Sequence, residues 1–231
     1  MKIALCPELL APTICALWIS CLPAAAAAQS EDGEVWINAA VSGPIAKDVQ
    51  LSLDSSVRFS DANTRRPARV IRPMIGYQVS KRVSLWAGYT RVEQFPDGRA
   101  PAIENRFFEQ LSWNVGRIGT ASISTRIRLE QRFFENGLGS SLRARQLVKI
   151  AVPVKGTKLS ILATTEPFIT LQTDVGGTRH GVEQWRNSIS LAVPLSPNLA
   201  VEVGYLNRYI IHDGAPDGVD HILPVTLSYH F

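Results

Sequence analysis

The residues best suited to chemistry in this sequence are charged side chains that recur at every second position. In residues 121–133 the even positions carry Arg126, Arg128, Glu130 and Arg132, whereas most of the odd positions are apolar. Because successive side chains of a β-strand point to opposite faces, this period of two places all four charges on one face of a strand. Such a ladder predicts either an ion-pair network or the lining of a path for ions.

The same alternation extends the charged face to other segments. Arg143, Arg145 and Lys149 share one parity in the next apolar-polar run. The complete set that we predict for this face is Asp54, Arg58, Arg72, Glu104, Arg106, Arg126, Arg128, Glu130, Arg132, Arg143, Arg145, Lys149, Glu166, Arg186, Glu202 and Arg208. Basic residues outnumber acidic ones in this set, so two interpretations stay open. The charges pair and fill the interior of a barrel, or they line a narrow path that weakly prefers anions.

One acidic residue conflicts with this assignment. Glu109 falls on the parity of the apolar face. A β-bulge near Phe107 and Phe108, or a position at the membrane interface, would resolve the conflict.

The histidines are the candidates for catalysis. His212-Asp213 and Asp220-His221 flank the last long loop and offer the Asp and His groups that could activate water at the rim of a barrel. This defines the alternative function, a rim-site hydrolase acting on lipid or peptide. It needs a third partner in a geometry that the sequence does not specify, so an enzyme is the less favoured reading. No cofactor is expected, and no His/Cys spacing typical of a metal site occurs.

The elements that must position these residues are β-strands. From about residue 48 to residue 231, about ten alternating runs are separated by turn residues, and tight turns alternate with longer polar loops. The runs are long enough for tilted strands that cross a bilayer. This pattern is typical of an antiparallel up-and-down barrel in the outer membrane. Ten strands put both chain ends on one side, so residues 29–47 are expected to form a lead-in. An eleventh strand at Val35–Val41 is disfavoured, and twelve strands stay open.

The composition excludes several other classes. The chain has 231 residues, 45% hydrophobic residues and a net charge of +4, which does not suit a disordered chain. After the first thirty residues no apolar run is long enough for a membrane-spanning helix. A soluble β-sandwich would show the same alternation with its faces reversed. Nucleic acid is not expected as a partner, because the arginines follow strand parity instead of forming one exposed run.

The N-terminus resembles a secretory signal. Lys2, the apolar stretch Ile14–Leu22 and the alanine run Ala24–Ala28 predict export and cleavage after Ala28, so residues 1–28 are a signal peptide. Acylation of Cys21 as a lipoprotein is the alternative. All three cysteines lie in this segment, which leaves the expected barrel, residues 48–231, without cysteine.

The C-terminus and the aromatic residues favour the bacterial outer membrane. Leu227, Tyr229 and Phe231 alternate with polar residues up to the end of the chain, as in the strand that the barrel-assembly machinery recognises. Aromatic residues near strand ends suggest interfacial girdles: Trp36, Tyr77, Tyr89, Trp113, Phe133, Trp185, Tyr205, Tyr229 and Phe231. Membrane lipid and the assembly machinery are the expected partners, and nothing indicates an oligomer.

Most of the chain after residue 36 resembles a known family of outer-membrane barrels, "domain of unknown function 2490". The resemblance is carried by Trp36, Leu51–Asp54, Arg58–Asp61, Leu85–Tyr89, Glu104–Leu111, Arg126–Phe133, Thr165–Phe168, Gly204–Leu206 and Asp220–His221. Asn105 stands where the family leads us to expect His. The resemblance implies a β-barrel in the outer membrane and no established activity.

Overall fold

The computed structural model describes residues 30–231 except 61–64, 97–99, 136–138, 176–178 and 215. The predicted signal peptide and Cys21 therefore lie outside the described residues. Eleven strands are present: β1 (Ser30–Pro44), β2 (Val49–Ser60), β3 (Arg65–Ser80), β4 (Val83–Pro96), β5 (Ala102–Ile118), β6 (Ala121–Phe134), β7 (Gly139–Pro153), β8 (Ser160–Thr173), β9 (Gly181–Pro194), β10 (Leu199–Ile210) and β11 (Gly218–His230). Across the described part of the chain we find no helix that is long and apolar enough to cross a membrane.

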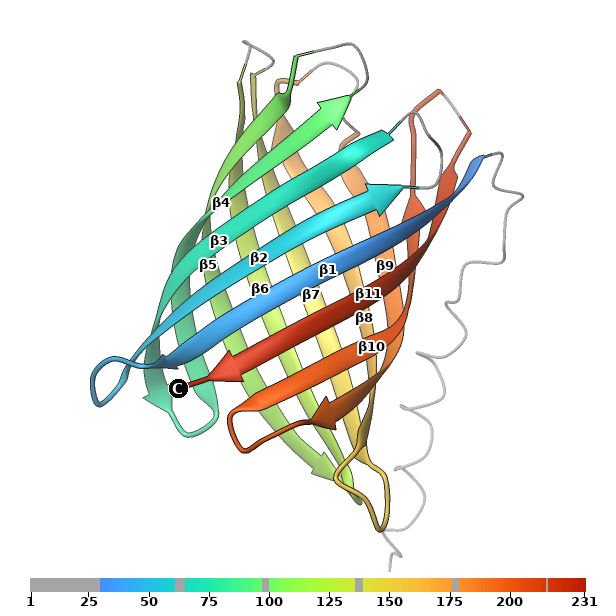
Figure 1. The fold of residues 1–231 in the computed structure, drawn as a ribbon. Helices are drawn as coiled ribbons and strands as arrows, with labels where there is room; N and C mark the ends of the chain where they lie inside the picture. Colours follow the sequence, from blue (N-terminus) through green and yellow to red (C-terminus); the bar gives the residue numbers. More distant parts are fainter. Residues whose placement is uncertain (1–29, 61–64, 97–99, 136–138, 176–178, 215) are drawn as a thin grey trace, which may run out of the picture.

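The strands form one closed barrel (Figure 1). Each strand pairs with its neighbour in the sequence, and β1 closes the barrel by pairing with β11. All of the sequential pairs are antiparallel, whereas β1 and β11 run parallel, with Ser30 opposite Gly218 and Ser42 opposite His230. Closure gives the backbone N–H and C=O groups of every strand a partner on both sides, so no strand is an open edge.

The all-β barrel and the ten strands expected after residue 48 are confirmed, as β2 to β11. The lead-in predicted for residues 29–47 is wrong, because Ser30–Pro44 is the first strand of the barrel. Strand parity disfavours an eleventh strand only where the strands at the seam pair antiparallel, and here β1 and β11 pair parallel. A parallel seam accommodates an odd number of strands and puts the start of β1 and the end of β11 at opposite ends of the barrel (Figure 1).

Two ends of the barrel are distinguished by their connections. At the short-turn end the connections are residues 45–48, 81–82, 119–120, 154–159 and 195–198. At the long-loop end they are residues 61–64, 97–101, 135–138, 174–180 and 211–217. The turn from β5 to β6 is tight because Gly119 adopts φ 58°, which glycine tolerates without steric cost.

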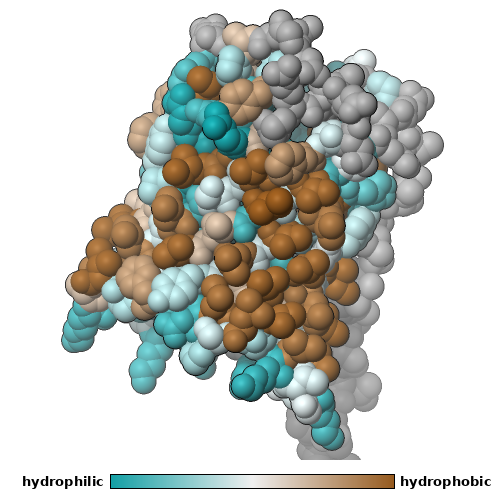
Figure 2. Space-filling view, viewed as in Figure 1, coloured by the Kyte–Doolittle hydropathy of each residue, from teal (hydrophilic) through white to brown (hydrophobic). Residues whose placement is uncertain are grey.

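The two faces of the wall have opposite chemistry. Ile37, Ile75 and Phe107 point outward, and more than half of each side chain is exposed. Arg128 and Glu130 point inward and are each only 1% exposed. Figure 2 shows a broad hydrophobic zone across the outer wall, with hydrophilic residues toward both ends of the barrel. This arrangement is the reverse of a soluble sandwich, in which the apolar face is buried.

Two inward-facing glycines make room for aromatic rings. Gly76 and Gly88 lie opposite Trp86 and Phe108 on the next strand. A Cβ atom on Gly88 would lie 2.4 Å from Cζ of Phe108 and 2.8 Å from Cβ of Met74, and a Cβ on Gly76 would lie 2.6 Å from the Trp86 ring. The absence of a side chain at these positions lets the rings lie across the neighbouring strand and fill the interior.

Candidate functional site

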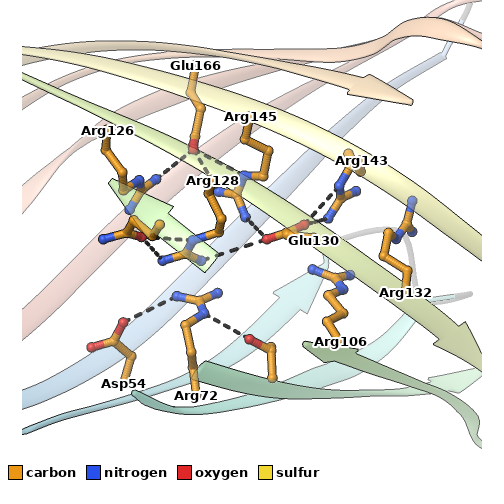
Figure 3. Close-up of polar contacts among 12 residues, drawn as sticks. Asp54, Arg72, Arg106, Arg126, Arg128, Glu130, Arg132, Arg143, Arg145 and Glu166 are labelled. Carbon is orange, nitrogen blue, oxygen red and sulfur yellow. Dashed lines mark hydrogen bonds and ion pairs between the residues drawn. The ribbon is translucent and has the colours of Figure 1, made fainter. Parts of the chain in front are cut away.

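Glu130 is the centre of a buried ion-pair network inside the barrel (Figure 3). One carboxylate oxygen accepts hydrogen bonds from Nε and Nη2 of Arg143 at 3.0 and 2.5 Å. The other accepts one from Nη1 of Arg145 at 2.8 Å and lies 3.8 Å from Nη1 of Arg128. These residues come from β6 and β7, whose register places Glu130 opposite Arg143 and Arg128 opposite Arg145. Side-chain alternation on two paired strands is therefore enough to assemble this centre.

Arg128 is held by a neutral partner as well as by charge. Its Nε and Nη2 donate to the amide oxygen of Gln110 on β5 at 2.9 and 2.5 Å. The guanidinium carbon lies 4.1 Å from the centre of the Phe108 ring, within the range of a cation–π contact. Gln110 and Phe108 share the inward parity of β5, so the same strand supplies both contacts.

Two further carboxylates extend the network along the barrel. Glu166 on β8 accepts hydrogen bonds from Arg126 at 2.6 Å and from Nε of Arg145 at 3.1 Å, so Arg145 bridges Glu130 and Glu166. Glu104 on β5 accepts from Arg106 at 2.7 Å and from Arg132 at 2.5 Å. We call the ion-paired side chains around Glu104, Glu130, Glu166 and Glu183 the lumenal network.

Glu183 belongs to this network although its strand parity places it outside. One carboxylate oxygen pairs with Arg143 at 2.6 Å, and the other lies 3.5 Å from Nη1 of Arg132 and accepts a hydrogen bond from Thr170 at 2.7 Å. The cause is a β-bulge between β8 and β9, where the register passes from Gln184 to Val182 and omits Glu183. A bulge adds one residue to a strand and redirects its side chain. Alternation alone therefore misses this carboxylate.

A second ion-paired group joins β1, β10 and β11. Arg208 donates to Glu34 at 2.6 Å and to Asp220 at 2.5 Å. The indole N–H of Trp36 donates to the other oxygen of Glu34 at 2.5 Å. Glu34 is absent from the predicted charged face because residues 29–47 were expected to form a lead-in and not a strand. Its position two residues before Trp36, on the same strand parity, is the signal that identifies it once residues 30–44 are read as a strand.

The remaining residues of the predicted charged face also point inward, outside the lumenal network. Asp54 on β2 accepts a hydrogen bond from Arg72 at 3.3 Å, and Nε of Arg72 donates to Thr90 at 3.2 Å. Glu202 accepts a hydrogen bond from Ser190. Lys149 lies on the inward face of β7, with Ser124 and Thr164 as its cross-strand neighbours.

Several arginines lie over aromatic rings inside the barrel in cation–π contacts. The guanidinium carbons of Arg145 and Arg186 lie 4.1 and 4.5 Å from the centre of the Phe168 ring. Those of Arg58 and Arg186 lie 4.0 and 5.0 Å from the centre of the Trp36 ring. Trp36 is 5% exposed, so its predicted place in an interfacial girdle is wrong. It shares the inward parity of β1 with Glu34 and serves as a platform for cations.

A cavity of about 350 Å³ extends from the lumenal network toward the long-loop end. Its floor includes Phe168 and Arg145, and its outer part includes His212 and Asp213. Among the described residues that line it, nine are arginines and three are acidic. Formal positive charges therefore outnumber negative ones among these lining residues.

The residues proposed for hydrolysis are not brought together. Asp220 points inward and is 3% exposed, whereas His221 points outward and accepts or donates a hydrogen bond with the Tyr205 hydroxyl at 2.6 Å. The wall of the barrel separates them. Asp213 pairs with Arg179 at 2.5 Å. Asp220 and His221 are adjacent in β11, and adjacent side chains of a strand point to opposite faces. Their adjacency in the sequence therefore keeps the two side chains apart.

His212 is engaged within its own loop. Its backbone N–H donates to Asp217 at 3.1 Å, and Nδ1 lies 2.9 Å from the carbonyl oxygen of Pro216. A hydrogen bond from the Tyr209 hydroxyl, followed by the one from the His212 backbone, lowers the pKa of the Asp217 carboxyl below its usual range. The ionised Asp217 carboxylate therefore accepts hydrogen bonds that hold this loop to Tyr209 and to the His212 backbone.

Glu109 stays on the outer face. The register between β4 and β5 is continuous from Val83–Trp113 to Gln94–Ala102, so the bulge considered near Phe107 and Phe108 does not occur. The Glu109 carboxylate accepts a hydrogen bond from Gln131 on β6 at 3.0 Å. This side-chain pair gives the carboxylate a polar partner on an otherwise apolar surface.

Comparisons with known proteins identify one relative and one family of unknown function. An uncharacterized protein of Methylorubrum extorquens strain AM1 is 29% identical over 209 residues, which cover 90% of this chain and 91% of that protein. No solved structure matches the chain. The model of a family described as "Protein of unknown function (DUF2490)" matches residues 33–218, from near the start of β1 to the start of β11. The chain therefore belongs to the DUF2490 family.

Proposed function

We propose that this protein is an integral β-barrel of the bacterial outer membrane whose interior is closed by charged side chains, so that its role is structural. The observation that carries the proposal is the reversal of the two faces. Charged side chains such as Arg128 and Glu130 are buried inside, whereas large apolar side chains cover the outside. In water such a continuous apolar surface is unfavourable at roughly 25 cal/mol per Å². A bilayer removes this cost.

Export and insertion fit the same proposal. The predicted signal peptide, residues 1–28, would direct the chain across the inner membrane. Leu227 and Tyr229 lie on the outer face of β11 and Phe231 directly follows this strand, and each of the three is more than 40% exposed. In this position they are available to barrel-assembly machinery before the seam with β1 closes.

Closure of the interior favours a structural role over an open pore. Arg128, Glu130, Phe108, Phe168 and Ile222 come from four strands around the barrel, and each is at most 2% exposed. Side chains fill the interior of a barrel of about eight strands, and here long arginine side chains and aromatic rings occupy the wider interior of eleven strands. A narrow path that prefers anions is the second candidate, favoured by the excess of arginine around the cavity at the long-loop end.

Fractionation and conductance test this proposal together. We expect the protein in the outer-membrane fraction, with an electrophoretic mobility that changes on heating because the folded barrel resists SDS. In planar bilayers the purified protein is expected to give no conductance above background, because the interior is filled. Recovery in the soluble periplasm would refute the membrane assignment. Anion-selective conductance steps would refute closure and establish the second candidate.

A further inference from the structure

Two arginines in the barrel interior lack an acidic partner. No carboxylate of the described residues lies within 4.0 Å of the guanidinium groups of Arg58 or Arg186. The carboxylates nearest in the strand register are already engaged. Glu166, opposite Arg186, pairs with Arg126 and Arg145, and Glu34, on the strand beside Arg58, is held by Arg208. Positive charge inside a barrel usually has a counter-charge, because burial of an unpaired ion is costly.

Both guanidinium groups are held in place by contacts that leave donors free. They lie over the Trp36 ring, 4.0 and 5.0 Å from its centre, and Arg186 also lies 4.5 Å from the centre of Phe168. Cation–π contacts use the flat face of a guanidinium and leave the N–H groups in its plane available. Nε of Arg58 is buried and has no hydrogen-bond partner among the described residues.

Arg186 has one neutral partner. The amide of Gln184, oriented with its oxygen toward the arginine, accepts from Nε and Nη2 at 2.5 and 3.0 Å. An amide oxygen accepts hydrogen bonds but supplies no full negative charge. Arg186 is thereby positioned without being neutralised.

Both arginines line the cavity at the long-loop end, together with Arg72, Arg106 and Arg208. Those three are paired with Asp54, Glu104 and the Glu34–Asp220 group. The uncompensated charge of the cavity therefore includes Arg58 and Arg186. The cavity volume of about 350 Å³ lies at the lower end of the range for small-molecule sites.

We propose that Arg58 and Arg186 form a binding site for a small soluble oxyanion, a carboxylate or phosphate group, in the cavity above the lumenal network. A planar guanidinium donates two parallel hydrogen bonds to such a group, which supplies both the charge and the acceptors that the two arginines lack. Chloride brings charge but no pair of oxygen acceptors. The site goes beyond the structural role proposed above, because a closed barrel does not require it.

The test compares oxyanions with chloride on the exported protein, purified in non-ionic detergent without phospholipid so that lipid headgroups are excluded as the source. Inorganic phosphate or acetate is expected to raise the midpoint of thermal unfolding above that in sodium chloride of the same ionic strength. Titration calorimetry gives the affinity for the more stabilising anion. Arg58→Gln and Arg186→Gln are each expected to weaken that affinity about tenfold or more, since each removes charged hydrogen bonds. Arg82→Gln, in an exposed turn at the short-turn end, is the matched control and should bind as the unmodified protein does.

Stability without added oxyanion separates this site from a structural role of the arginines. Arg58→Gln and Arg186→Gln are expected to retain heat-modifiable mobility and an unchanged or raised unfolding midpoint, because each removes an unpaired charge. Equal stabilisation by chloride and by both oxyanions would overturn the site. Undiminished oxyanion binding by the double variant would also overturn it. Neither result would affect the fractionation or the conductance, so failure of this proposal is distinguishable from failure of the proposed function.

Discussion

Glu130→Gln is expected to lower the free energy of unfolding of the barrel by about 3–5 kcal/mol, the range for breaking a buried ion pair by removing one partner. The glutamine keeps the shape of the side chain but loses the charge that balances Arg143 and Arg145. Both arginines are buried, so water does not replace the lost charge. Glu166 and Glu183 compensate only in part, since each is already paired with another arginine, Arg126 and Arg132 respectively.

Denaturant titration of the purified barrel, followed by the heat-modifiable band or by tryptophan fluorescence, measures this loss. Glu109→Gln is the matched control, because it makes the same chemical change on the outer face, where the carboxylate accepts a hydrogen bond from the neutral Gln131 side chain. We expect the control to stay within about 1 kcal/mol of the unmodified protein. Equal losses for the two variants would contradict the role of Glu130 as the centre of the network.

Gly88→Val is expected to cost about 1–3 kcal/mol through overpacking. A Cβ atom at this position would overlap the Phe108 ring and crowd Met74, and the valine methyl groups add to the conflict. Phe108 is 2% exposed, and the guanidinium group of Arg128 lies over its ring. Displacement of the ring would therefore also disturb the lumenal network.

The neighbouring position provides the control for this substitution. Ala87→Val introduces the same side chain on the same strand, but on the outward face, where Ala87 is exposed. The same denaturant titration should show almost no loss for Ala87→Val. A Gly88→Val barrel as stable as the unmodified one would mean that the interior is loosely packed, contrary to the closed lumen.

Much of this architecture could be predicted from the sequence, because the period of two is a local property. The alternation in residues 121–133 predicted β6 to within one residue, and it put Arg126, Arg128, Glu130 and Arg132 on one face. The structure places these four side chains inside. Alternation does not predict which carboxylate pairs with which arginine, because these ion pairs depend on the register between neighbouring strands.

The misassigned residues each have an identifiable physical cause. Glu183 was left out of the predicted charged face because a bulge breaks the parity of β9, and a bulge leaves no clear mark in a single sequence. Glu34 and Trp36 were misplaced because closure by a parallel seam was not anticipated. The stacking of Arg58 and Arg186 on one ring depends on how far side chains reach across the interior, which is a property of the closed barrel and not of any one strand.

We expect the apolar face of this barrel to meet lipid, while the charged face lines its interior. Tryptophan fluorescence in vesicles of lipid brominated on the acyl chains tests it directly, because bromine quenches only the rings that it contacts. Trp113 and Trp185 point outward, whereas Trp36 and Trp86 point inward. A Trp36→Phe/Trp86→Phe variant should be strongly quenched, and a Trp113→Phe/Trp185→Phe variant should be quenched little, provided that both keep heat-modifiable mobility. Equal quenching of the two variants, or stronger quenching of the inward pair, would contradict the account.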